Sequence, residues 1–146
     1  MHGNGERKIM MNRFIAYNMP KIELHCHLDG SMSVELTKKL LADMGEEYTK
    51  EELQEALTAP MDCPSLADYL KRFDLPLRCL QTKNGLRAAA EELALRAAKE
   101  QVKYLEVRFA PSFSTGQGLS VKEIIESVNE GLKSAETKCD IHTGIL

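Results

Sequence analysis

The sequence predicts an α/β fold with a parallel sheet. Three short segments have the residue pattern of strands, and helical patterns separate them. The resulting order is strand, several helices, strand, helix, strand, which is typical of βα units that build a parallel sheet. The predicted strands cover residues 21–29, 103–111 and 139–146.

The first predicted strand has two faces of opposite character, because side chains alternate along a strand. The apolar face consists of Ile22, Leu24, Cys26 and Leu28. The polar face consists of Lys21, Glu23, His25, His27 and Asp29. Two imidazoles followed by a carboxylate are a rare choice for a solvated strand face. This face is therefore predicted to line a functional site.

Capping residues predict where the next helices begin. Ser33 is placed to cap a helix over 34–45, which Gly45 ends. Thr49 and Glu52 have the spacing of a capping box, in which each side chain bonds to a free backbone N–H group of the other. A second helix is expected to follow Thr49 directly.

The same reasoning extends to the later helices. Ser65 is expected to cap a further helix, and Asn84-Gly85 is expected to form a turn before an alanine-rich helix over 86–101. Ser120 and Glu123 form a second capping box, and the residues after them repeat apolar positions at helical spacing.

The second predicted strand also has two unlike faces. Its apolar face consists of Leu105, Val107 and Phe109, and its polar face of Tyr104, Glu106 and Arg108. Parallel sheets covered on both sides normally have apolar strands throughout. A parallel barrel of the (β/α)8 TIM type accommodates the pattern, since helices cover the outer face and polar side chains point inward near the mouth.

The length of the chain indicates how much of such a barrel it can form. An eight-stranded barrel needs roughly 250 residues, whereas this chain has 146 residues and three predicted strands. It is expected to be the N-terminal portion of a barrel, about three βα units, apparently truncated. Residues 1–18 are expected to be an uncertain extension and 19–146 the barrel segment. The unpaired outer strands would allow self-association.

Composition excludes several classes of protein. The net charge of −3 and the pI near 5.8 indicate no attraction to nucleic acid or to anionic membranes. No apolar run approaches the ~20 residues of a membrane span, and the N-terminus lacks the pattern of a secretory signal. The four cysteines form no C-x-x-C pair, so we expect reduced thiols in a cytoplasmic protein.

The His-x-His pair predicts a metal site. His25 and His27 lie on one side of the strand, from where their nitrogens can converge on one zinc ion. Together with Asp29 they lie at the carboxyl end of the strand, where catalytic groups of βα barrels are found. A catalytic zinc ion usually has at least three protein ligands. His142 is a candidate third ligand, or a residue on an ordinary strand face.

Three segments resemble the adenosine deaminase family of zinc-dependent amidohydrolases. They read MPKIELHCHLDGS at the first strand, SLADYLKRFDLPLRCLQT in the helical region, and KEQVKYLEVRFAPS at the second strand. The resemblance implies a TIM-type barrel that hydrolyses adenosine or 2′-deoxyadenosine to inosine or deoxyinosine and ammonia. In that family a zinc-activated water attacks C6 of the purine, and a glutamate transfers the proton.

The resemblance also implies roles for individual residues. His25 and His27 would bind one zinc ion, His27 would also touch the nucleoside substrate, and Asp29 would hydrogen-bond a ribose hydroxyl. Glu106 and Arg108 would form an internal ion pair or orient the metal ligands. An apolar wall or lid over the nucleoside would consist of Leu66, Tyr69, Leu70 and Phe73, whose spacing also suits an ordinary core-facing helix.

Part of the family's catalytic machinery is not expected within these 146 residues. The proton-shuttle glutamate, the third histidine ligand, a second catalytic histidine and a metal-binding aspartate would all follow residue 146. Three interpretations stay open: an adenosine deaminase, a deaminase of adenine, AMP or a modified nucleoside on the same barrel, and an inactive fragment.

Overall fold

A three-stranded parallel sheet forms the centre of the protein. The computed structural model describes residues 12–146, and the strand order is β1-β2-β3. The strands are β1 (Lys21–His27), β2 (Val102–Arg108) and β3 (His142–Ile145). Both strand pairs are parallel, with Cys26 opposite Val107 and Leu105 opposite Thr143. The predicted α/β class and its parallel sheet are confirmed.

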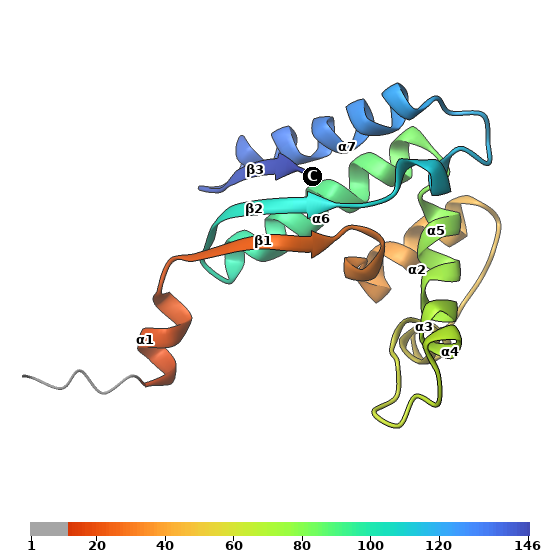
Figure 1. Cartoon of the computed structure of the whole chain (residues 1–146), viewed down its shortest axis with the longest axis horizontal. Coiled ribbons are helices and arrows are strands. Elements are labelled where there is room, and N and C mark those ends of the chain that lie inside the picture. The colour runs from red at the N-terminus through yellow and green to blue at the C-terminus, as the bar shows by residue number, and fades with distance from the viewer. Residues whose placement is uncertain (1–11) are drawn as a thin grey trace, which may run out of the picture.

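The helices form two groups (Figure 1). The long helices α6 (Lys83–Lys99) and α7 (Val121–Glu136) lie against one face of the sheet. Four shorter helices lie beyond the carboxyl end of β1: α2 (Val34–Asp43), α3 (Lys50–Leu57), α4 (Leu66–Leu70) and α5 (Asp74–Cys79). A short helix, α1 (Arg13–Asn18), precedes β1 within the segment that the sequence suggested to be an extension. Residues 1–11 of that segment lie outside the described residues.

The main core lies between the sheet and the two long helices. Leu105 and Val107 of β2 are fully buried there, against Leu86 and Ala90 of α6 and Ile124 of α7. A second, smaller core joins the short helices and contains Leu40, Leu41, Leu53 and Cys79. Burial raises the pKa of the Cys79 thiol to about 11, which makes it an inert packing group.

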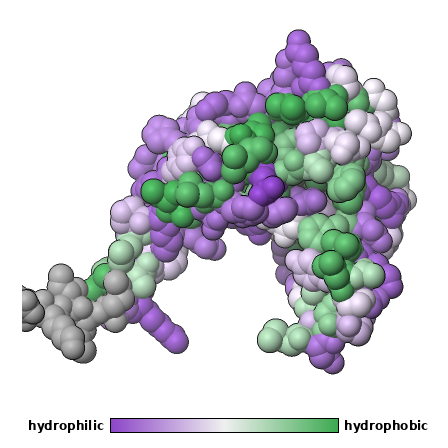
Figure 2. Space-filling model, viewed as in Figure 1, coloured by the Kyte–Doolittle hydropathy of each residue, from purple (hydrophilic) through white to green (hydrophobic). Residues whose placement is uncertain are grey.

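The apolar face of β1 is only partly covered. Leu28 is buried and Cys26 packs against the main core, but Ile22 is 68% exposed. Leu24 is exposed as well. Figure 2 shows the resulting apolar surface over the region that β1 occupies in Figure 1. The sequence predicted that helices cover this face. Within residues 12–146 that prediction is wrong for Ile22 and Leu24, which are exposed.

The predicted helix starts are confirmed at four positions. The side chains of Ser33, Ser65, Thr49 and Ser120 each accept a hydrogen bond from the first turn of their helix, and the last two form complete capping boxes. Gly45 adopts a φ of +82° after α2, as a helix-ending glycine does. Local hydrogen-bond chemistry determined these boundaries.

Several predicted boundaries are wrong. The strand predicted over 103–111 is Val102–Arg108, and the strand predicted over 139–146 is His142–Ile145. β1 ends at His27, and Asp29 begins a 3-10 turn, Asp29–Ser31, instead of extending the strand. Asn84-Gly85 is not a turn before α6; both residues lie in its first turn, which Thr82 caps. Gly85 is needed there for packing, since a Cβ atom at this position would lie 1.9 Å from the carbonyl oxygen of Cys79.

The capping box of α7 predicts a pH dependence of stability. Lys83 Nζ lies 2.8 Å from the Glu123 carboxylate, which also accepts hydrogen bonds from Ser120. These contacts, the lysine first, lower the pKa of Glu123 from 4.5 to about 2. A lowered pKa means that the stabilisation is complete above pH 4.5 and is lost as the pH falls toward 2.

We therefore expect Glu123→Gln to destabilise the protein at neutral pH, with a difference from the unmodified chain that shrinks below pH 4.5. Urea unfolding midpoints measured across this pH range test the expectation. Glu126→Gln, in the same helix and 3.7 Å from Lys122, is the matched control and should have a smaller effect. A Glu123 difference that did not change with pH would contradict this account.

Candidate functional site

A cleft of about 740 Å³ opens where β1 and β2 end. Its lining comes from three places: the end of β1 with its following turn, the segment from α4 to α5, and the residues that follow β2. The carboxyl ends of neighbouring parallel strands are the usual place for a site in such folds. The polar face predicted from the sequence leads into this cleft.

His25 and His27 project from the end of β1 with their ring centres 5.3 Å apart and their planes tilted by 45°. Two imidazoles that share one tetrahedral zinc ion, each with a nitrogen about 2.0–2.1 Å from the metal, have ring centres about 5 Å apart. The His27 side chain is 53% exposed, so its nitrogens are accessible. The separation of the two rings therefore fits the two-histidine part of a zinc site.

The part of the chain that the structure describes brings no complete set of metal ligands to this pair. Among residues 12–146, no group of three or more His, Cys, Asp or Glu side chains is placed to hold a metal ion. His142, the candidate third ligand, pairs with Tyr104, whereas His27 pairs with Arg108. Four residues of strand, about 13 Å, separate these levels, so His142 lies at the other end of the sheet.

Arg108 contacts His25 directly. Its Nη1 lies 3.0 Å from Nδ1 and 2.8 Å from Nε2 of that ring. Because one nitrogen approaches both ring nitrogens, the guanidinium covers His25 on the side that faces β2. Glu106 instead accepts a hydrogen bond of 2.8 Å from the Tyr104 hydroxyl, which raises the pKa of Tyr104.

The expected ion pair between Glu106 and Arg108 is therefore wrong for the described part of the chain, since each side chain has another partner. The alternative expectation, in which Arg108 orients a metal ligand, stays a prediction. Arg108 contacts His25, but a guanidinium only donates hydrogen bonds, whereas a zinc-bound histidine needs an acceptor for its second N–H group. The polar face of β2 thus divides into a tyrosine–glutamate pair and an arginine that belongs to the site.

Asp29 lies in the turn after β1, with its side chain only 15% exposed. Its Oδ1 accepts a hydrogen bond of 2.9 Å from the Gly30 N–H group and lies 3.9 Å from His27 Nδ1. The turn changes the direction of the chain, but Asp29 still lines the cleft together with His27. The carboxylate is thereby held in place beside the histidine pair.

Three of the four predicted wall residues, Tyr69, Leu70 and Phe73, line the cleft. Tyr69 and Phe73 meet edge to face with ring centres 5.6 Å apart. Phe73 also packs onto the turn after β1, where a Cβ atom on Gly30 would lie 3.2 Å from its ring. Leu66 is 72% exposed and does not contribute to the lining.

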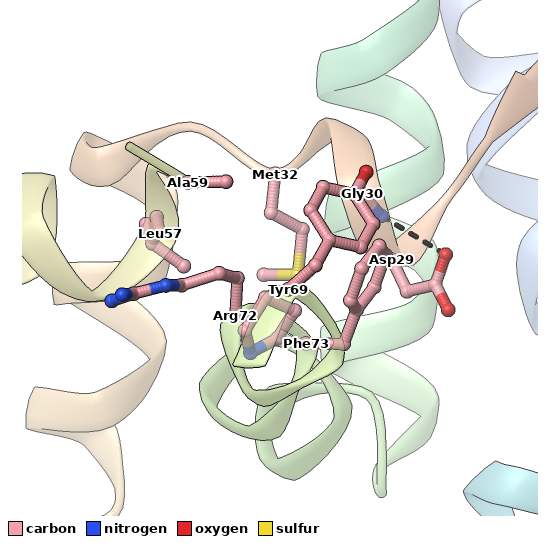
Figure 3. Close-up of a pocket in the computed structure, with 9 residues that line it drawn as sticks. Asp29, Gly30, Met32, Leu57, Ala59, Tyr69, Arg72 and Phe73 are labelled. Atoms are coloured by element: carbon pink, nitrogen blue, oxygen red, sulfur yellow. Dashed lines mark hydrogen bonds between the residues drawn. The ribbon is translucent and has the colours of Figure 1, made fainter. Parts of the chain in front are cut away.

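Arg72 anchors this wall on the side away from the sheet (Figure 3). Its Nη1 donates a hydrogen bond of 2.9 Å to the carbonyl oxygen of Glu55 in α3. Figure 3 shows Tyr69 and Phe73 beside the Asp29–Gly30 turn, while Arg72 extends toward Leu57. The aromatic wall is therefore fixed between α3 and the end of β1.

A second apolar wall was not predicted from the sequence. It follows β2 and consists of Phe109, Ala110 and Phe113, and Leu77 of α5 also lines the cleft. Phe113 belongs to a 3-10 turn, Pro111–Ser114, and is 60% exposed. The signal available in the sequence was an aromatic residue, Phe113, two positions after Pro111. Only the folded arrangement shows which element it faces.

The chain matches the family described as Adenosine deaminase over residues 20–146. The adenosine deaminase of Clostridium perfringens is 46% identical over 132 residues, which are 88% of this chain and 40% of that protein. The adenosine deaminase of Lactococcus lactis is 41% identical over 141 residues, 95% of this chain and 40% of that protein. The chain thus spans about 40% of the length of these curated relatives.

Solved structures of deaminases have the same arrangement. The adenine deaminase of Arthrobacter aurescens is 25% identical, with a TM-score of 0.74 over 86% of this chain and 38% of that chain. The Arabidopsis protein ADAL complexed with IMP is 27% identical, with a TM-score of 0.68 over 89% and 40%. A Burkholderia amidohydrolase with bound Zn, 17% identical with a TM-score of 0.75, shares the fold.

Proposed function

Because the chain belongs to the adenosine deaminase family, we propose that the protein that carries it deaminates adenosine and 2′-deoxyadenosine hydrolytically, releasing ammonia. The observation that carries this proposal is the His25–His27 pair at the end of β1, with His27 and Asp29 lining the cleft, in a chain 46% identical to an adenosine deaminase. The products would be inosine and 2′-deoxyinosine, which places the reaction in purine salvage.

His25 and His27 would hold a zinc ion, and their ring separation of 5.3 Å supports this assignment. A zinc ion in such a site lowers the pKa of a water molecule bound to it to about 7, which makes a nucleophile available at neutral pH. Arg108 Nη1 lies within 3.0 Å of both His25 nitrogens and has only N–H groups to donate, so it would have to move away from one of these nitrogens when the ring binds zinc.

The remaining residues of the cleft would bind the nucleoside. Asp29 would accept a hydrogen bond from a ribose hydroxyl, and His27 would contact the substrate as well. Tyr69, Leu70 and Phe73 would cover the purine and exclude water from it. The aromatic edge-to-face pair gives this wall a rigid surface suited to a flat base.

Two alternatives follow from other observations. Solved relatives include an adenine deaminase and an N6-methyl-AMP deaminase of Arabidopsis, 25% and 28% identical, so the same cleft in a longer protein could take another purine. The identity of 41–46% to proteins named adenosine deaminase favours adenosine. For the described residues 12–146 alone we propose no deaminase activity, since the two imidazoles they bring together are an incomplete ligand set.

The proposal extends to the setting of the protein. No described helix is long and apolar enough to cross a membrane. The four cysteines are free thiols, which supports a reducing, cytoplasmic environment. The open edges of β1 and β3 would allow self-association. The net charge of −3 supports no binding to nucleic acid.

The test is an assay of the native gene product that carries this sequence, with adenosine, adenine and AMP as separate substrates. We expect deamination of adenosine, loss of activity on chelation, and recovery on addition of zinc. Deamination of adenine or AMP alone would favour the alternative substrates. Absence of all three activities, with zinc supplied, would overturn the proposal.

Asp29→Ala in that product is expected to raise KM for adenosine about 10- to 100-fold, because a hydrogen bond to a charged group contributes about 1.5–3 kcal/mol. The zinc content should stay unchanged, since the histidines remain. Adenine, which lacks the ribose, provides the control as a competitive inhibitor, and its inhibition constant should not change. Equal losses for adenosine and adenine would show that Asp29 does not act on the ribose.

A further inference from the structure

We propose that Gln81 is a positioning residue that fastens the two apolar walls of the cleft to each other and sets the width of the purine slot. The inference rests on the proposed function for the identity of the ligand, but the fastening itself follows from the structure. Gln81 does not line the cleft, and it acts through the backbone of residues that do.

Three hydrogen bonds join the Gln81 side chain to α5, which directly follows the first wall in the chain, and to the second wall and the loop after it. Its Nε2 donates to the carbonyl oxygen of Leu77 at 2.7 Å and to that of Phe113 at 2.7 Å. Its Oε1 accepts from the N–H group of Gly116 at 3.0 Å. Leu77 lies in α5, next to the wall that contains Phe73, and Phe113 is in the opposite wall. The Gln81 amide thus joins α5 to the 111–114 turn without lining the cleft itself.

These bonds satisfy groups that have few other partners. Leu77 is in the last turn of α5, where carbonyl oxygens have no partner within the helix. Phe113 is 60% exposed, so packing of its ring contributes little to holding the 111–114 turn. The backbone bonds to Gln81 therefore add a restraint on this wall to those from the buried Ser114 and from the hydrogen bond of the Phe113 N–H group to the Ala110 carbonyl oxygen.

The chemistry requires glutamine at this position. Two donors and one acceptor are used at once, which a primary amide supplies and a carboxylate or an alkyl side chain does not. Residue 116 must be small for the same contact, since a Cβ atom on Gly116 would lie 2.9 Å from Gln81 Oε1. The absence of a side chain at residue 116 thus allows the loop to approach the amide.

The first experiment measures the fastening in the full 146-residue chain without ligand. In Gln81→Leu, we expect amide hydrogen exchange of Gly116 to accelerate about tenfold or more, as a lost hydrogen bond of about 1.4 kcal/mol implies. Gln81→Glu keeps an acceptor, so Gly116 should stay protected while the carbonyl ¹³C shifts of Leu77 and Phe113 change. Gln54→Leu, which removes only an exposed bond to Thr58, is the control.

The second experiment measures the consequence for binding and catalysis. Adenosine is titrated into the same chains by NMR, and we expect about tenfold weaker binding in Gln81→Leu. In the native product KM should rise while kcat stays within about twofold, as for an interaction that contributes equally to ground and transition states. A residue that only stabilises the fold would lower the unfolding midpoint without this KM effect.

The outcomes separate the two proposals. Unchanged Gly116 exchange and unchanged Phe113 shifts in Gln81→Leu would overturn the role of Gln81, whatever the ligand result. Faster exchange with an unchanged KM would also overturn it, since the walls would then move without affecting the substrate. Altered exchange in a native product that does not deaminate adenosine would support the fastening and overturn the proposed function.

Discussion

The His27→Ala variant of the native product is expected to lose its zinc and at least about hundredfold in deaminase activity. Mutation of groups that only orient metal ligands already costs 10- to 100-fold, and His27 would be a ligand itself. His25→Ala should behave in the same way, because the two rings lie 5.3 Å apart on one strand and would share the ion. Zinc content by elemental analysis gives a result that does not depend on activity.

His142→Ala is the matched control for these variants. His142 is also a histidine of the sheet, but it pairs with Tyr104 at the opposite end from the cleft. It should keep both zinc and activity. Retention of zinc in His27→Ala, or its loss in His142→Ala, would contradict the assignment of the metal site.

The largest expected effect on stability comes from Gly131→Ala. Gly131 is buried in α7 where that helix meets α6, and a Cβ atom there would lie 2.2 Å from the carbonyl oxygen of Arg87. Backbone cannot move aside as a flexible side chain can, so the two helices would have to separate. Overpacking typically costs 1–3 kcal/mol, and we expect a loss of at least about 2 kcal/mol in the free energy of unfolding.

Gly45→Ala separates this packing effect from the general effect of removing a glycine. No atom lies within 4 Å of a Cβ built at Gly45, and only its φ of +82° opposes a side chain. That strain costs about 1–2 kcal/mol. Urea denaturation of the three proteins gives the comparison. A Gly131→Ala variant as stable as the unmodified chain would show that α6 and α7 can separate without cost.

The sequence predicted those features that neighbouring residues determine. The helix starts at Ser33 and Ser120 follow from local hydrogen bonds, and the alternation in β1 follows from strand geometry. The same alternation indicated that His25 and His27 share a face. These features need no knowledge of distant parts of the chain.

Other features depend on contacts between distant segments, which a single sequence does not specify. Asn84-Gly85 has the composition of a turn, yet the approach of Cys79 and the cap at Thr82 place both residues in a helix. Arg108 reaches His25 across 83 positions of the chain, and Phe113 lines the same cleft as Leu77 of α5. Such pairings are decided by packing, so periodicity alone could not predict them.

The open edges of the sheet have a consequence for every stability measurement on this chain. Within residues 12–146, β1 and β3 each pair with β2 alone, and Ile22 and Leu24 are exposed on β1. A strand of another molecule can bind such an edge only in the folded form. Association therefore stabilises the folded form, and does so more at higher protein concentration. Unfolding midpoints should therefore be compared at equal protein concentration, and their dependence on dilution measures how strongly the edges are occupied.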